Sequence, residues 1–193
     1  MKKSMVEQQI KASIAVKNQL LVDSELIDLI AHWAEVCTLS LRSEGKVVFC
    51  GNGGSFADAQ HLSAEFTSRF LFDRPGLASI ALGTNSSAMT AIGNDYGFDQ
   101  VFSREIEAGV TDKDVLIALT TSGNSSNILK ALAAAEKKRV PMVVLTGKTG
   151  GSLPHHVSMI KVPSSDTARV QESHILIGHI ICEIVEFNMF GME

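Results

Sequence analysis

Between Lys46 and Phe66 the sequence reads KVVFCGNGGSFADAQHLSAEF. Its first five residues form a short run rich in β-branched side chains, which is typical of a buried strand. A glycine-rich turn follows at 51–55, and the helical pattern after it extends to about residue 72. A strand that continues through a tight turn into a helix is the first half of a crossover between parallel strands. This segment therefore predicts an α/β fold.

The same alternation of strand and helix continues to the end of the chain. We expect strands at 77–82, 114–119, 141–145 and 157–162, and helices at 86–92, 98–108, 126–138 and 167–189. Upstream, two helices are expected at 5–21 and 24–41, with Ser24 as the N-cap of the second. Apolar strands joined by amphipathic helices form a mostly parallel sheet covered on both faces. Residues 1–193 are therefore expected to form one domain, in which residues 1–44 pack on the core or on a neighbouring subunit.

The composition is that of an ordinary globular protein. Of 193 residues, 45% are hydrophobic, and 17 basic against 21 acidic side chains give a net charge of −4. The absence of a dense basic stretch argues against general nucleic-acid binding. The three cysteines are far apart and odd in number, which predicts reduced thiols and a cytoplasmic protein. The most apolar late stretch, 175–185, contains His179 and Glu183 and is too short to span a bilayer, so no membrane partner is expected.

In open parallel sheets, ligands bind beyond the carboxyl ends of the strands, so the turns that leave the strands are of most interest. The turn at 51–55 fails as a dinucleotide fingerprint because Phe56 occupies the position of the third small residue. It is similar to a nucleophile elbow centred on Ser55, for which His155 or His156 could be the base. It could also be a cradle of backbone amides for an anionic or polyhydroxy ligand, or simply a tight turn.

A second polar turn, TTSGNSSN at 120–127, lies between an expected strand and an expected helix. One hydroxyl is enough to cap a helix. Four hydroxyl side chains gather here, on Thr120, Thr121, Ser122 and Ser125. Hydroxyls and free amides at the start of a helix form a neutral pocket for phosphate. We therefore favour an anion site over a simple cap.

Two pairs of polar residues on expected helices could carry chemistry. His61 and Glu65 are four residues apart, which puts imidazole and carboxylate on one helix face, where both could grip a metal or a substrate. Gln171 and His179 are about 80° apart around the last helix and so share one broad face. The plainer interpretations are a solvated His–Glu pair and a core histidine satisfied by one hydrogen bond.

Taken together, six motifs resemble the sugar isomerase (SIS) domain, and within it the bacterial phosphoheptose isomerase family. The resemblance covers nearly the whole chain, including the N-terminal helices. The motifs are CGNGGS (50–55), ADAQHLSAEF (57–66), AIGNDYGF (91–98), TTSGNSSN (120–127), LTGKTGG (145–151) and ARVQESHILIGHIIC (168–182).

This resemblance implies a three-layer α/β sandwich with a five-stranded parallel sheet, assembled as a homotetramer with active sites at subunit interfaces. The implied reaction converts D-sedoheptulose 7-phosphate to D-glycero-D-manno-heptose 7-phosphate, which opens heptose synthesis for lipopolysaccharide. The implied acid/base pair is Glu65 and His179. The implied sugar contacts are Asn52, Gly53, Gly54, Ser55, Glu65 and Gln171, with Asn94 and Asp95 nearby. Phosphate would be held by Thr120, Thr121, Ser122 and Ser125, and zinc by His61, Glu65, Gln171 and His179.

One position departs from the family pattern. Some members carry an acidic residue just before the arginine of the last motif, where this chain has Ala168. A non-catalytic SIS relative, which binds the replication initiator protein, shares much of the pattern but lacks the Glu and His of the pair. The alternative function is therefore a sugar-phosphate sensor or a protein-binding adaptor. Because Glu65 and His179 are both present, catalysis is favoured.

Overall fold

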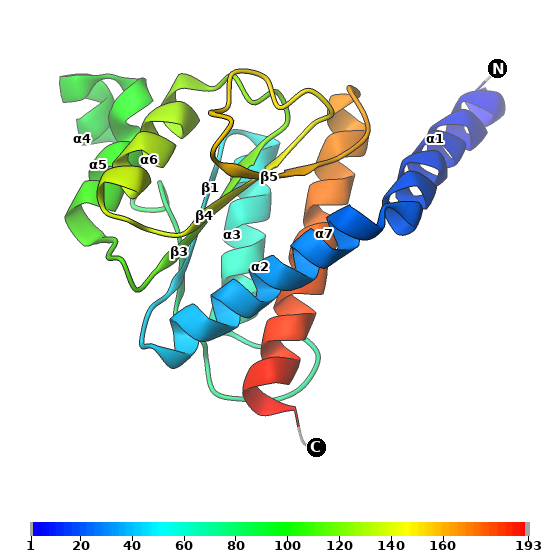
Figure 1. Ribbon diagram of the computed structural model, residues 1–193. Helices are drawn as coiled ribbons and strands as arrows, with labels where there is room; N and C mark the ends of the chain where they lie inside the picture. The colour runs from blue at the N-terminus through cyan, green and yellow to red at the C-terminus, as the bar shows by residue number, and fades with distance from the viewer. Residues whose placement is uncertain (1, 192–193) are drawn as a thin grey trace.

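The computed structural model describes residues 2–191 and contains one five-stranded parallel sheet between two layers of helices (Figure 1). The strands lie in the order β2-β1-β3-β4-β5. Their bounds are β1 Val47–Gly51, β2 Ser79–Ala81, β3 Val115–Thr120, β4 Met142–Thr146 and β5 Ser158–Lys161. The helices are α1 Lys2–Val22, α2 Ser24–Arg42, α3 Gly54–Thr67, α4 Ser86–Tyr96, η1 Phe98–Gln100, α5 Val101–Gly109, α6 Ser126–Lys137 and α7 Thr167–Phe190. The predicted α/β class and five-stranded parallel sheet are confirmed.

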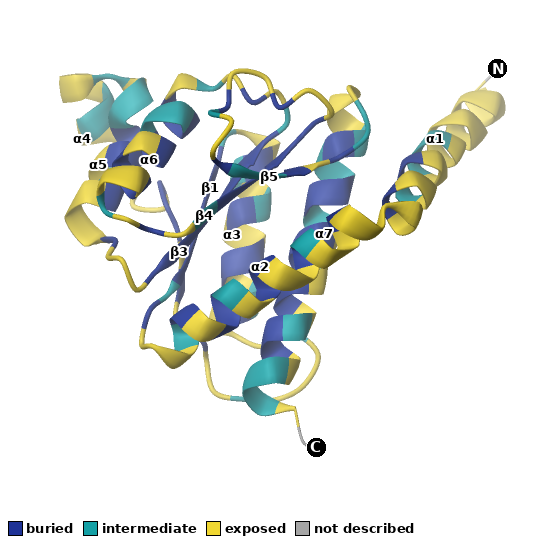
Figure 2. Cartoon of the chain, in the orientation of Figure 1, coloured by how far each residue is buried: buried dark blue, intermediate teal, exposed yellow. Residues whose placement is uncertain are grey.

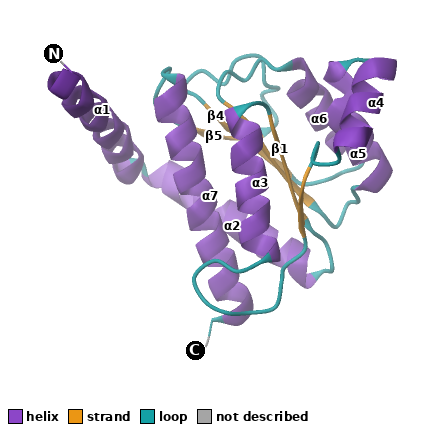
Figure 3. Cartoon of the chain, turned by 180° about the vertical axis from the view of Figure 1, so that it is seen from behind, coloured by secondary structure: helices purple, strands orange, loops and turns teal. Residues whose placement is uncertain are grey.

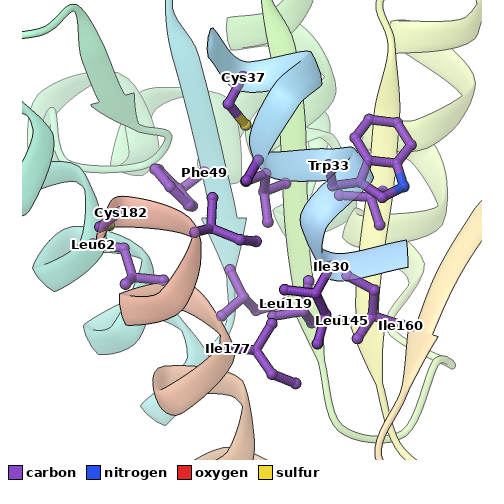
Figure 4. Close-up of a cluster of buried hydrophobic side chains, with 14 of the residues drawn as sticks. Ile30, Trp33, Cys37, Phe49, Leu62, Leu119, Leu145, Ile160, Ile177 and Cys182 are labelled. Atoms are coloured by element: carbon purple, nitrogen blue, oxygen red, sulfur yellow. The ribbon is translucent and has the colours of Figure 1, made fainter. Parts of the chain in front are cut away.

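The central strands β1 and β3 are buried on both faces because each face is covered by its own group of helices (Figure 2). Side chains alternate along β1, so that Val47 and Phe49 point to one layer while Val48 and Cys50 point to the other. Helices α2, α3 and α7 cover the first face, and α5 and α6 cover the second. Figure 4 shows the first of these cores, in which side chains of α2, α3 and α7 meet those of the strands.

Several helix boundaries differ from the prediction: α1 begins at Lys2 and α4 extends to Tyr96, and two other differences have a clear physical reason. The N-cap of α2 is Asp23 and not Ser24, because the Asp23 carboxylate accepts a hydrogen bond from the backbone N–H of Leu26 at 3.0 Å. Helix α3 ends at Thr67, five residues before the predicted end at 72. It ends early because the Arg74 guanidinium donates to the carbonyl oxygens of Glu65 and Phe66, which a longer helix would use itself.

The closing helix α7 is the most apolar long helix in the described part of the chain. By length and composition alone its 24 residues would be enough to cross a membrane, although the interrupted stretch 175–185 suggested otherwise. Its apolar side chains have another explanation, because α7 packs against α2 and α3 and places Ile177, Ile181 and Val185 in the first core. We therefore interpret α7 as a core helix.

The two N-terminal helices differ in how they contact the rest of the chain. Helix α2 inserts Ile30, Trp33 and Cys37 into the first core. Helix α1 extends away from the sheet and is mostly exposed (Figures 1 and 2). Its exposed side chains include Met5, Val6, Ile10 and Ile14, which are all apolar.

Candidate active site

Two loops meet at the carboxyl end of the sheet because β1 and β3 are paired in parallel, with Gly51 opposite Leu119. Between the turn after β1 and the turn after β3 lies a small cavity of about 80 Å³. It is lined by Asn52, Ser55, Leu119, Thr120, Thr121, Ser122 and Ser125. The four hydroxyl residues predicted to bind phosphate therefore share one pocket with two of the residues predicted to contact the sugar.

Two helices begin at this pocket, and neither has a side-chain cap. The N-cap residue of α3 is Gly53, and that of α6 is Ser125, whose hydroxyl makes no capping hydrogen bond. The first amides of a helix have no partner within the helix and carry its positive dipole end. At the start of α3 the N–H groups of Ser55 and Phe56 already donate to the carbonyl oxygens of Asn52 and Gly53, so most of the unpaired amides that the pocket can offer to an anion belong to the first turn of α6.

An amide pair holds the two loops together. Asn52 and Asn127 each donate a side-chain N–H to the other's carbonyl oxygen at 2.8 Å. Asn127 is buried at the start of α6, so the pair is shielded from water on one side. Sequence reasoning missed Asn127 as a site residue, although it ends the TTSGNSSN motif.

A third turn contacts the loop that forms the hydroxyl-lined pocket. The Gly147 N–H donates to the carbonyl oxygen of Thr121 at 3.2 Å, and the Ser152 N–H donates to that of Gly123 at 3.1 Å. Gly123 has a φ of +69°, and a Cβ there would lie 2.1 Å from the carbonyl oxygen of Gly150. Only glycine fits this crossing of two loops.

Below this turn, His174 of α7 is fully buried beside the end of β4. Within residues 2–191 neither ring nitrogen of His174 has a hydrogen-bond partner, and the nearby Thr146 hydroxyl has none either. Burial lowers the pKa of His174 from 6.5 to about 4. The nearby backbone of Thr146 acts in the opposite direction and raises this pKa, but its effect is smaller. The imidazole is therefore neutral at pH 7.

This buried imidazole predicts acid lability. Between pH 6.5 and 4 the unfolded chain protonates His174 and the folded chain does not, so stability is lost as pH falls through this range. The contribution of this residue is about 3 kcal/mol between pH 7 and pH 4. Urea unfolding at both pH values should show a smaller pH dependence for His174→Phe than for the wild type. The exposed His155 provides the matched control, since His155→Phe should keep the wild-type pH dependence. Equal pH dependence in wild type and His174→Phe would contradict the assignment.

Helices α3 and α7 lie side by side and bring together two distant segments of the chain (Figure 3). Gly178 permits this approach, because a Cβ at that position would lie 2.4 Å from Leu62 Cδ1. The Nε2 atom of His61 lies 2.9 Å from Nε2 of His179 and 3.3 Å from Oε1 of Glu65. These three side chains offer ligand atoms that all lie within 4.8 Å of one another. The carboxylate and the imidazole that sequence reasoning paired are neighbours in space.

The surroundings of His179 favour its neutral form. Burial lowers the pKa of His179, and the nearby His61 lowers it further, while Glu65 and Asp58 act in the opposite direction. A neutral imidazole has a lone pair that can accept a proton or bind a metal. The ring of Phe70 stacks on that of His179, with centroids 5.4 Å apart and planes 24° apart.

Gln171 lies between the hydroxyl-lined pocket and the His–Glu cluster. A Cβ on Gly54 would lie 2.1 Å from Nε2 of Gln171, so this amide packs directly on the first turn of α3. Asp58 is its other neighbour. Burial raises the pKa of Asp58. A hydrogen bond with Gln171 opposes that shift most, followed by the charges of His61 and His179. Sequence reasoning missed Asp58, although its spacing of three residues from His61 places both on one face of α3.

Comparisons with known proteins agree on one family. A family model described as the SIS domain matches residues 13–147. A phosphoheptose isomerase of Aneurinibacillus thermoaerophilus is 50% identical over 186 residues, which are 96% of this chain and 94% of the relative. The chain belongs to the phosphoheptose isomerase family of SIS-domain proteins.

Solved structures of phosphoheptose isomerases have the same fold over almost their whole length. The protein from Neisseria gonorrhoeae is 39% identical, with a TM-score of 0.88 and coverage of 96% of this chain and 99% of its own. The protein from Francisella tularensis is 35% identical, with a TM-score of 0.91 and coverage of 96% and 98%. The family resemblance inferred from the six motifs is thus confirmed.

Two of the predicted sugar contacts lie away from the His–Glu cluster. Asn94 and Asp95 are exposed on α4, where the Asn94 amide donates to the Asp95 carboxylate at 2.8 Å. Helix α4 packs against η1 and α5, on the face of the sheet opposite α3 and α7. Within one chain these two residues are therefore separated from the His–Glu cluster, and their role remains a prediction.

The nucleophile-elbow interpretation finds no support in the geometry. Ser55 lines the pocket at the amino end of α6, whereas His156 pairs with Glu136 at 3.1 Å, near the carboxyl end of the same helix. His155, beside it in sequence, is exposed. Neither histidine is placed to act as a base for Ser55. Membership of an isomerase family also argues against a hydrolase.

Proposed function

We propose that this chain isomerises D-sedoheptulose 7-phosphate to D-glycero-D-manno-heptose 7-phosphate, the step that opens heptose synthesis for lipopolysaccharide. The observation that carries the proposal is the convergence of Glu65 and His179 from α3 and α7. The hydroxyl-lined pocket nearby suits the phosphate group of such a substrate. The names of the relatives, phosphoheptose isomerases at up to about half identity over most of their length, support the same substrate.

The proposed mechanism is proton transfer through an enediolate. Moving a ketose carbonyl from C2 to C1 requires a base that takes a proton from C1 and returns it at C2. We assign this role to Glu65, whose carboxylate is partly buried beside His61. His179 is the complementary acid and base for the substrate oxygens, because its neutral ring can accept a proton at one oxygen and return it at the other.

The phosphate pocket contributes by holding the far end of the sugar. Its hydroxyls and helix amides bind a group that does not react, so their binding energy fixes the chain of the substrate in register with the acid/base pair. The Asn52–Asn127 pair keeps both walls of the pocket in place before substrate arrives. Gln171, between the pocket and the pair, is positioned to contact the middle of the sugar.

The donor set at the α3–α7 crossing fits zinc. Two imidazole nitrogens and one carboxylate oxygen are typical zinc ligands, and their mutual separations allow one ion to reach all three. We propose that His61, Glu65 and His179 hold the ion, with Gln171 as the fourth ligand, so that zinc would compete with the transferred proton for the lone pairs of Glu65 and His179. Zinc bound there would polarise the oxygens of the substrate.

We further propose a cytoplasmic homotetramer whose active sites are completed at subunit interfaces. The exposed apolar side chains of α1 are not buried by any other part of residues 2–191, so we expect another subunit to pack against them. Because α4 lies on the face of the sheet opposite the His–Glu cluster, we assign Asn94 and Asp95 to the active site of a neighbouring subunit. The three buried, free cysteines suit a reducing compartment.

Incubation of the purified protein with sedoheptulose 7-phosphate in D₂O tests the function directly. We expect formation of the aldose with deuterium at C2, because the proton carried by Glu65 can exchange with solvent. A chain that binds the sugar phosphate without turnover would be a sensor or adaptor instead. An aldose product without deuterium, at early and late reaction times alike, would indicate either that the transferred proton does not exchange with solvent or that a hydride is transferred instead.

The phosphate assignment predicts a selective loss of affinity in Ser125→Ala. The Ser125 hydroxyl lines the pocket but makes no capping bond, so its removal should not destabilise α6. Loss of a hydrogen bond to a charged group should raise KM about tenfold or more, with kcat nearly unchanged. Steady-state kinetics and the Tm measure both effects. The neighbouring Ser126 is exposed and does not line the cavity, so Ser126→Ala is the control. Equal KM values for the two variants would contradict the assignment.

A further inference from the structure

The loop between α3 and β2 is anchored on a buried carboxylate. We call residues 68–76 the strap, because this segment leaves the end of α3 and runs against α7. Glu186 of α7 is 1% exposed, and its carboxylate accepts backbone N–H bonds from Phe70 at 2.9 Å and from Leu71 at 2.7 Å. The same carboxylate pairs with Nε of Arg74 at 2.9 Å. All of these groups come from the strap.

The other end of Arg74 holds helix α3. Its Nη1 atom donates to the carbonyl oxygen of Phe66 at 2.7 Å, and its Nη2 atom donates to that of Glu65 at 2.8 Å. The Arg74 side chain is only 3% exposed. Buried ion pairs add little net stability compared with apolar residues of similar size, so a role in fixing a conformation is a reasonable explanation for this one.

The strap delivers one aromatic ring to the acid/base pair. Phe70, held by its backbone on Glu186, stacks on His179. The ring of His61 meets His179 edge-on, with centroids 5.1 Å apart and planes 69° apart. The imidazole of His179 is thus restrained by Phe70 and by His61, and both restraints are carried by α3 or by the loop that follows it.

We propose that Phe70 is a positioning residue, which fixes the plane of the His179 imidazole, and that the Arg74–Glu186 pair holds Phe70 in place for this purpose. This inference rests on the proposed function, because the orientation of His179 matters for proton transfer at the substrate oxygens. Phe70 acts through His179. A misplaced imidazole slows proton transfer, while the phosphate pocket, which lies on other loops, is unaffected.

Kinetics of ring-removing variants test the proposal. Phe70→Leu and Phe70→Met should lower kcat about 10- to 100-fold while KM changes less than about twofold. Phe70→Tyr keeps the ring and should restore kcat to within about threefold of the wild type. The control is Phe72→Leu, because Phe72 lies in the same strap but lines a groove with Leu71 and Ile180 and has no stacking contact with His179. A wild-type kcat in folded Phe70→Leu or Phe70→Met would overturn the proposal.

An NMR measurement separates this inference from the function itself. The stacked ring should shift the Cε1 proton of His179 upfield, and the shift should disappear in Phe70→Leu and Phe70→Met but remain in Phe70→Tyr. The resonance is assigned by its absence from His179→Asn. If the wild type does not turn over sedoheptulose 7-phosphate, the proposed function fails, but the shift still reports whether Phe70 stacks on the imidazole, the contact on which the positioning role depends. An unchanged resonance in both ringless variants would overturn the positioning role even if the enzyme is active.

Discussion

We expect Glu65→Gln to lower kcat about a thousandfold or more while the protein remains folded. Glutamine has almost the same shape as glutamate, but its amide cannot take a proton from C1, and general acid–base catalysis of this kind is worth about 10²- to 10⁴-fold. The side chain is 21% exposed, so the substitution should hardly change the Tm. Turnover of sedoheptulose 7-phosphate and deuterium incorporation should be lost together, and binding of inorganic phosphate should persist.

The matched control is Glu183→Gln, which removes a carboxylate from the exposed face of α7, four residues after His179. This variant should keep its activity. Zinc content should be measured in both variants, because Glu65 is also a proposed metal ligand. A Glu65→Gln protein that retains zinc and has no turnover has lost its base, whereas one that has lost zinc as well has lost the metal site. Near-normal turnover would remove Glu65 from the mechanism.

The largest expected effect on stability is that of Glu186→Gln. This change leaves the Arg74 guanidinium buried without a counter-charge, at a site where both side chains are 3% exposed or less. Removing one partner of a buried ion pair costs about 3–5 kcal/mol. Urea unfolding at pH 7 should show a loss of this size, and part of it should come from release of the strap.

A more accessible ion pair on the same helix provides the comparison. Glu172 is 31% exposed and contacts Arg169 at 2.8 Å and Lys17 at 3.5 Å. Because solvent screens these charges, Glu172→Gln should cost less than about 1 kcal/mol. Should Glu186→Gln prove equally mild, the buried pair would not be the anchor of the strap.

The fold could be predicted from the sequence because its signals are local. Each strand is a short apolar run, and each helix has an apolar face, so element order and parallel pairing follow from a single pass along the chain. The boundaries are harder to predict where distant groups decide them. Helix α3 ends at Thr67 because of Arg74 and Glu186, and no pattern within the helix indicates that contact.

The two parts of the candidate site, the hydroxyl-lined pocket and the His–Glu cluster, also differ in how well the sequence alone predicts them. The hydroxyls of the proposed phosphate pocket are close together in sequence, so their clustering at 120–125 can be seen in the sequence alone. His61 and His179 are separated by 118 positions, and their convergence depends on how closely α3 approaches α7 at Gly178. Phe70 carries no signal at all, because an aromatic residue in a loop is common and its stacking partner lies on another helix.

Helix α7 carries Gln171, His174, His179 and Glu186 along one continuous helix, so that the proposed sugar contact, the end of β4, the imidazole and the strap all depend on its alignment. A single extra residue between Ser173 and Gly178 would rotate everything after it by about 100° and put all later contacts out of phase at once. Length changes should therefore be tolerated in the exposed parts of the β4–β5 connection and excluded from this helix. We therefore expect the loops of this fold to vary in length, whereas the spacing of residues along α7 should stay constant.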